Sequence, residues 1–199
     1  MISPLERLGY KDGLPNGDVR EVGPAEPLAP VDDMASWVEE SGKIVLPPGV
    51  RLDLAGVGKA LGIGWAAAHL AGHTGLLVDV GGDVVALGTD EEGEPWRASV
   101  FHEGTVGEFA GSPLALATST TKLRAWSAAG REAHHLIDPR TGAPTEGEIV
   151  FATVSAPTIL EADLAAKLLI IEGSAALERL DDGCRAVATD RLGRTEVLR

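Results

Sequence analysis

The sequence has very few cysteines and aromatic residues. Its 199 residues include a single cysteine, Cys184, and aromatic residues make up 4% of the chain. A lone cysteine excludes both an internal disulfide framework and a cysteine-based metal cluster, and we interpret Cys184 as a small, buried apolar residue. The core is therefore expected to be aliphatic, and the 25 glycines and 12 prolines indicate many turns.

Basic side chains are scarce as well. The chain has 17 Lys and Arg against 30 Asp and Glu, which gives a formal net charge of -13. A protein this acidic offers no electrostatic footprint for a nucleic-acid backbone or an anionic membrane surface. We therefore expect no nucleic acid among its partners. An anionic small substrate remains compatible with this charge if a bound metal supplies positive charge locally.

Long apolar runs are also absent. No stretch approaches the roughly 20 apolar residues that a membrane-spanning helix needs. The opening residues, MISPLERLGYKDG, contain neither an apolar signal region nor a small-residue cleavage site. The sequence as written therefore predicts no transmembrane segment and a cytoplasmic protein.

The order of the predicted elements favours an α+β fold. Helical spacing predicts helices over residues 32–40, 56–71, 161–172 and 174–180. Runs of β-branched and other apolar residues predict strands over residues 44–46, 50–54, 76–80, 84–87, 96–101, 106–109, 114–119, 134–137, 149–155, 184–189 and 195–198. The strands outnumber the helices and mostly follow one another. We therefore predict one domain over residues 1–199, with a mainly antiparallel sheet and packed helices.

A glycine-rich turn resembles a dinucleotide-binding fingerprint. Gly56, Gly58 and Gly62 follow a short predicted strand and open a helix, and Asp79 ends the next strand. The glycine spacing is one residue longer than the common form, and the chain does not continue as alternating strand and helix. A Rossmann-type dinucleotide-binding protein is therefore a disfavoured alternative.

Four segments, in chain order, resemble the ApbE-type FAD:protein FMN transferases. They read LDLAGVGK at 52–59, VDVGGD at 78–83, ATS at 117–119 with HHLIDPRTG at 134–142, and EAD at 161–163. They are similar to the family strings DLGGIAK, NxGGD, TSG with HxIDPxTG, and EADALATA. The match covers about residues 50–175, and the first portion of the family domain, which carries part of the flavin site, is expected to be missing. The resemblance implies an ApbE-like flavin transferase fold.

The resemblance also implies a reaction and a set of binding residues. FAD would be the substrate, FMN would pass to a Ser or Thr hydroxyl of an acceptor flavoprotein, and AMP would leave. Magnesium would neutralise the pyrophosphate. The residues implied to bind the dinucleotide are Gly56, Gly58, Lys59, Gly81, Gly82, Asp83, Thr118, Ser119, Asp138, Thr141 and Gly142.

The candidate catalytic residues are His135, Asp163 and Lys167. His135 matches the active-site histidine and would be the general base, while Asp163 and the backbone of Gly58 would hold the metal. Adjacent strand residues point to opposite faces, so His134 and His135 cannot both face one pocket. Where the family has threonine, four residues after the aspartate, this chain has Lys167. Either water replaces the missing hydroxyl around magnesium, or the Lys167 ammonium pairs with Asp163 and replaces part of the metal's charge. We favour the second arrangement, which predicts weak or absent transferase activity.

Other interpretations stay open. A non-catalytic flavin- or nucleotide-binding protein is the main alternative, because of Lys167 and the missing family portion. A serine hydrolase would need an activated Ser119 or Ser155, but the sequence contains no G-x-S-x-G motif. Structural roles are the plain alternatives for four of the site residues: a solvated Lys59, a turn-capping Asp83, a hydrogen-bonded strand histidine at His135 and a first-turn helix acid at Asp163.

Overall fold

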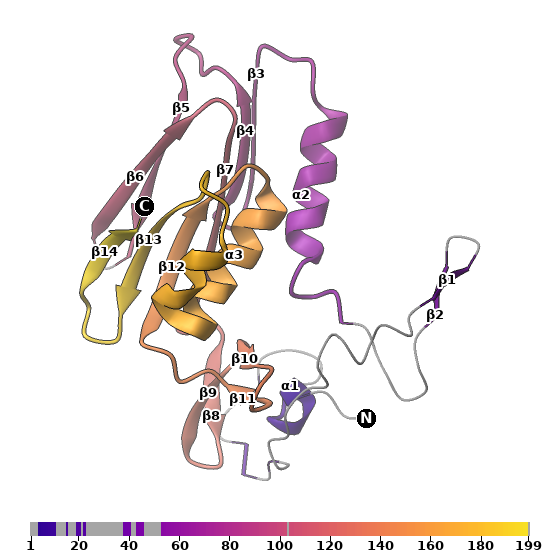
Figure 1. Cartoon of the computed structure of the whole chain (residues 1–199), viewed down its shortest axis with the longest axis vertical. Coiled ribbons are helices and arrows are strands. Elements are labelled where there is room, and N and C mark those ends of the chain that lie inside the picture. The colour runs from indigo at the N-terminus through magenta and orange to yellow at the C-terminus, as the bar shows by residue number, and fades with distance from the viewer. Residues whose placement is uncertain are drawn as a thin grey trace. The chain divides into compact units, whose positions relative to one another are not determined.

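The computed structural model describes residues 4–10, 15, 19–20, 22, 38–40, 43–45, 53–102 and 104–198 (Figure 1). Within it the chain forms two compact units. The smaller unit joins Met1–Leu54 to Leu123–Thr145, and the larger unit joins Ala55–Lys122 to Glu146–Arg199. The two units are described separately below.

The larger unit is built on a six-stranded sheet in which all neighbouring strands are antiparallel. The strand order is β14-β13-β12-β7-β4-β3. The strands are β3 (Gly75–Val80), β4 (Asp83–Gly88), β7 (Leu114–Thr120), β12 (Ile149–Ser155), β13 (Arg185–Asp190) and β14 (Thr195–Leu198). The predicted α+β class with a mainly antiparallel sheet is confirmed. A Rossmann fold would need parallel strands joined by helices, so that alternative is wrong.

The central strands of the sheet are covered on both faces. The hairpin of β5 (Trp96–Phe101) and β6 (Thr105–Gly111) contributes Val100 and Phe109 to a core cluster with Leu116 and Phe151 of the sheet. On β7 and β12, the residues that alternate with those facing the hairpin are mostly small. Helix α3 packs against these same two strands. Burial of both faces explains why β12 reads as a continuous apolar run rather than an alternating one.

Two helices of the larger unit lie where they were predicted, to within two residues at each end. Helix α2 (Gly58–His69) buries Ala60, Ile63 and Ala67, which recur at helical spacing. Helix α3 (Ile159–Glu172) begins at a capping box, in which Thr158 Oγ1 accepts from the Glu161 N–H at 3.2 Å and the Glu161 carboxylate accepts from the Thr158 N–H at 2.9 Å.

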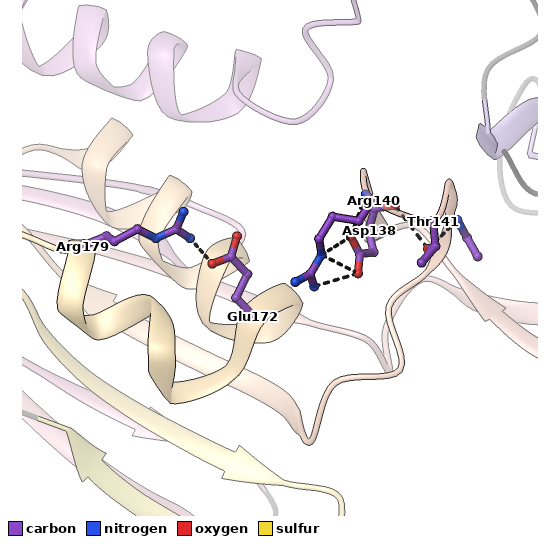
Figure 2. Close-up of polar contacts among 6 residues, drawn as sticks. Asp138, Arg140, Thr141, Glu172 and Arg179 are labelled. Atoms are coloured by element: carbon purple, nitrogen blue, oxygen red, sulfur yellow. Dashed lines mark hydrogen bonds and ion pairs between the residues drawn. The ribbon is translucent and has the colours of Figure 1, made fainter. Parts of the chain in front are cut away.

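The segment after α3 is helical, as predicted, but has 3₁₀ geometry. The element η2 (Gly173–Arg179) follows α3 directly. Arg179 pairs with the carboxylate of Glu172, the last residue of α3 (Figure 2). Among the residues that the structure describes, no helix is both long enough and apolar enough to cross a membrane.

The smaller unit has its own apolar cluster. Trp126 lies at its centre with Ala128 and Ala133, and its indole N–H donates to the carbonyl oxygen of Leu8 at 2.9 Å. The unit's elements are α1 (Pro4–Arg7), β1 (Val38–Glu40), β2 (Lys43–Val45), β8 (Ala125–Ala128), β9 (Arg131–His134), β10 (Ile137–Asp138) and β11 (Ala143–Pro144). These strands form three antiparallel pairs, β1 with β2, β8 with β9 and β10 with β11.

Three local predictions are wrong. Residues 38–40 form strand β1 rather than the end of a helix, because they pair with β2; the rest of the predicted helix, 32–37, lies outside the described residues. The predicted strand over 134–137 is broken by a bend at His135, because the chain changes direction there to enter the β10–β11 hairpin. Asp53 and Leu54 belong to no strand, and residues 50–52 lie outside the described part.

Candidate functional site

The β3–β4 hairpin presents the first candidate binding segment. Val80 pairs with Asp83, so the turn consists of Gly81 and Gly82, with φ of 61° and 87°. Two positive φ values define a type I′ turn, which glycine adopts without strain. A Cβ on either glycine would meet no atom within 4 Å. The backbone conformation thus requires these glycines, and their outer side is left open to a ligand.

The start of α2 is similarly open. The N-cap residue, Val57, makes no side-chain capping bond to the first amide groups of the helix. A Cβ on Gly56 or Gly58 would meet no atom within 4 Å, whereas one on Gly64 would touch an Ile159 methyl group at 3.5 Å. Close helix packing therefore accounts for Gly64 but not for Gly56 and Gly58.

Asp83 is a buried carboxylate that joins three elements of the larger unit. Its side chain is 1% exposed; Oδ1 accepts from the Thr118 N–H at 3.1 Å, and Oδ2 lies 2.7 Å from Lys59 Nζ on α2. Thr118 Oγ1 in turn lies 2.8 Å from Thr153 Oγ1. These contacts give Asp83 a structural role, and they show that Lys59 is ion-paired rather than simply solvated. The Lys59 side chain as a whole remains 43% exposed.

The end of β7 is regular strand paired with β12. The strand continues through Thr120, which pairs with Phe151, and the Thr120 hydroxyl donates to the Val150 carbonyl oxygen at 2.9 Å. Ser119 is buried within the same strand, and Ser155 ends β12. Neither serine occupies the sharp strand-to-helix turn of a hydrolase nucleophile, which disfavours the serine hydrolase alternative.

In the smaller unit, the two adjacent histidines differ in environment. His134 is buried at the end of β9; its Nδ1 accepts from the Leu136 N–H at 3.3 Å, and its Nε2 lies 3.0 Å from the Thr145 carbonyl oxygen. In the neutral ring, this network places the proton on Nε2. His135 lies half-buried at the bend that follows. The structure therefore gives His134 a structural role, while His135 is the candidate for chemistry through the family motif.

The Asp138–Gly142 turn is held by its own aspartate. The Asp138 carbonyl oxygen accepts from the N–H groups of Thr141 at 3.2 Å and Gly142 at 2.8 Å, and Gly142 has a φ of 67°. Nε and Nη2 of Arg140 donate to the Asp138 carboxylate at 2.9 and 2.8 Å (Figure 2). Thr141 Oγ1 accepts from the Ala143 N–H at 3.2 Å. Hydrogen bonds from Arg140 hold the pKa of Asp138 below its usual value.

The lowered pKa of Asp138 predicts a pH-dependent contribution to stability. Replacing Asp138 with asparagine should cost at most about 1 kcal/mol at neutral pH, because the Arg140 partner is exposed. Folding favours the ionised carboxylate. The contribution is therefore fully present above the unfolded pKa of about 3.9 and is lost as the pH falls through the lower folded-state pKa. Urea unfolding should show a smaller difference between parent and variant at about pH 3 than at pH 7. A difference that does not change with pH would contradict this assignment.

The remaining candidate residues lie on α3. Asp163 is buried one turn beyond the start of the helix, and Lys167 Nζ pairs with its Oδ1. The predicted pairing of these two side chains is confirmed. The acid in the first turn is Glu161, so interaction with the helix dipole is not the main role of Asp163.

The fold built from these segments is that of solved ApbE proteins. The structure matches the ApbE protein of Thermotoga maritima with a TM-score of 0.73 at 22% identity, over 83% of this chain and 57% of that one. It matches the apo flavinyl transferase ApbE of Pseudomonas stutzeri with a TM-score of 0.71 at 20% identity, over 98% and 65% of the two chains.

The sequence establishes the family. The model of the ApbE family matches residues 24–188, and the chain therefore belongs to the ApbE family. Among curated proteins it is 36% identical over 141 residues to the FAD:protein FMN transferase of Klebsiella pneumoniae (strain 342), which covers 63% of this chain and 39% of that protein. It is 37% identical over 128 residues to that of Escherichia coli (strain K12), covering 58% and 35%. The chain thus matches well under two thirds of the length of these relatives.

Proposed function

We propose that this chain takes part in the reaction for which its relatives are named, the transfer of FMN from FAD to a protein hydroxyl. The observation that carries the proposal is the segment from His134 to Gly142. It reads as the family's motif, and the fold uses its residues for distinct tasks: His134 fixes the bend, Asp138 and Gly142 shape the turn, and His135 lies half-buried at the bend. Family membership over residues 24–188 supports the same conclusion.

The proposed reaction is a phosphoryl transfer within the pyrophosphate of FAD. The oxygen of an acceptor Ser or Thr hydroxyl bonds to the phosphorus of the FMN half. The bond from that phosphorus to the bridging oxygen breaks, and AMP leaves with the electron pair. His135 takes the hydroxyl proton as general base. Such a reaction depends mainly on positioning and on neutralisation of phosphate charge.

Residues of the larger unit would bind the dinucleotide. The uncapped start of α2 at Gly58 and the turn at Gly81 offer backbone N–H groups to phosphate oxygens, whereas the Gly82 N–H already donates to Asp79 Oδ1 at 2.9 Å. Lys59 follows Gly58 on the same helix, and its side chain is 43% exposed. Because the chain carries a net charge of -13, a phosphate ligand needs such locally placed cations. Thr118, Ser119, Asp138 and Thr141 remain proposed binding positions through the family match.

Magnesium, which the family implies, does not fit the described residues well. Magnesium requires oxygen ligands in near-octahedral geometry. Its proposed carboxylate ligand, Asp163, is already paired with the Lys167 ammonium. The described part of the chain also holds no group of three or more His, Cys, Asp or Glu side chains arranged around a metal position. The proposed chemistry therefore assigns no step to a resident metal.

A transfer assay with a binding measurement tests the proposal. The chain is incubated with FAD and an acceptor protein that a full-length relative flavinylates in parallel, and mass spectrometry follows the gain of one FMN. We expect slow transfer above the level without enzyme, together with weak binding of FAD in calorimetry. Binding without transfer would favour the non-catalytic flavin-binding alternative. No heat with FAD, ADP or AMP at millimolar concentrations would reject the proposed function altogether.

A further inference from the structure

The pair of Asp163 and Lys167 is built into one face of α3. The two residues are separated by one helical turn, a spacing that brings their side chains together. The Lys167 ammonium pairs with Asp163 Oδ1 and also lies 3.5 Å from the carbonyl oxygen of the same residue. One cation therefore contacts two of the oxygens that Asp163 could offer to a metal.

Burial makes this pair more than a surface contact. The side chain of Asp163 is 7% exposed and that of Lys167 is 22% exposed. They share α3 with a buried apolar face that includes Ala162, Ala166 and Ile170. Water screens charges poorly in such surroundings, so the attraction between ammonium and carboxylate is stronger there than at the surface.

A divalent cation could reach Asp163 only by displacing the ammonium. The ion pair has no net charge, so it does not attract a second cation as a free carboxylate would. A displaced Lys167 would also leave a positive charge on the same helix face as the incoming metal, where the two would repel each other.

We propose that Lys167 replaces a divalent cation in this chain: the Asp163 carboxylate holds the ammonium, the site binds no magnesium, and Lys167 itself supplies positive charge toward a phosphate. This inference rests on the proposed function for the identity of the anionic ligand. The prediction that the site binds no magnesium concerns only Asp163 and Lys167, and it does not depend on transferase activity.

A metal titration tests the inference without FAD or an acceptor. Free Mn²⁺ is measured by electron paramagnetic resonance as it is added to the parent, Lys167→Thr, Asp163→Asn and the double variant. The parent and Asp163→Asn should give the same curve, which reports only weak binding to the acidic surface. Lys167→Thr should bind one further Mn²⁺ per chain, and the double variant should lose it.

Two results would overturn the inference. One is a parent protein that binds one Mn²⁺ more than Asp163→Asn, since the ammonium would then not exclude the metal. The other is a folded Lys167→Thr variant, checked by circular dichroism, that gains no binding. Lys167→Ser keeps a hydroxyl at the same position and serves as the second variant if Lys167→Thr does not fold. Failure of FMN transfer alone would count against the proposed function and not against the inference about Lys167.

Discussion

Replacing Asp83 with alanine is expected to lower the free energy of unfolding by about 2–4 kcal/mol. The substitution removes the acceptor of the Thr118 N–H and the partner of Lys59 from a position that is 1% exposed. The Thr118 N–H would then lose its hydrogen-bond acceptor, whereas the half-exposed Lys59 side chain can turn toward water. Urea unfolding followed by far-ultraviolet circular dichroism measures the change.

Matched variants separate the contributions to this effect. Asp83→Asn keeps an oxygen that can accept from Thr118 and should cost less than Asp83→Ala. Lys59→Met leaves the buried carboxylate without its cation and should also be clearly destabilising. Glu91 is an exposed carboxylate, and Glu91→Ala should change stability by no more than about 0.5 kcal/mol. If Asp83→Ala is as mild as Glu91→Ala but abolishes nucleotide binding, Asp83 serves the ligand rather than the fold.

The structural role of Asp83 could not be predicted from the sequence. Its partners, Lys59 and Thr118, lie 24 and 35 residues away along the chain, and no periodic pattern links such positions. The sequence offered only a turn cap or a ligand contact. The pairing of Asp163 with Lys167, in contrast, follows from helical spacing alone, and the sequence predicted it.

The larger elements were predictable because strong local patterns agree with the fold. The apolar run of β12 and the helical run of α3 were each found in the sequence. The start of α3 was placed at Glu161 instead of Ile159. The capping box of Thr158 and Glu161 is visible in the sequence and would have placed the start correctly.

The wrong predictions have local chemical causes. The strand through His134 ends because the His134 side chain accepts from the Leu136 N–H, and this bond competes with strand continuation. Ser41-Gly42 is a turn signal that fits the hairpin of β1 and β2 better than a helix ending at Glu40. Hydrophobic spacing reveals neither the end of the strand at His134 nor the turn at Ser41-Gly42. The first depends on a hydrogen bond of one side chain, and the second depends on the conformational freedom of one glycine.

Replacing His135 with alanine is expected to reduce the rate of FMN transfer by about 10²–10⁴-fold, the usual contribution of a general base. The residue is half-buried, and the bend beside it is held by His134, so the fold should persist. FAD binding by calorimetry should therefore change little while transfer falls. An exposed histidine, His73, provides the matched control, and His73→Ala should transfer FMN at the parent rate.

The pH dependence of transfer gives a more specific test of His135. A general base accepts the hydroxyl proton only while its imidazole is unprotonated, so the parent rate should rise with pH. His135→Ala should lose this rise, whereas a variant with a merely distorted site would keep it at a lower overall rate. Because Lys167 is expected to make transfer slow, the comparison is repeated in the Lys167→Thr background. Rates of His135→Ala within threefold of the parent in both backgrounds, with the rise intact, would assign the proton to another acceptor.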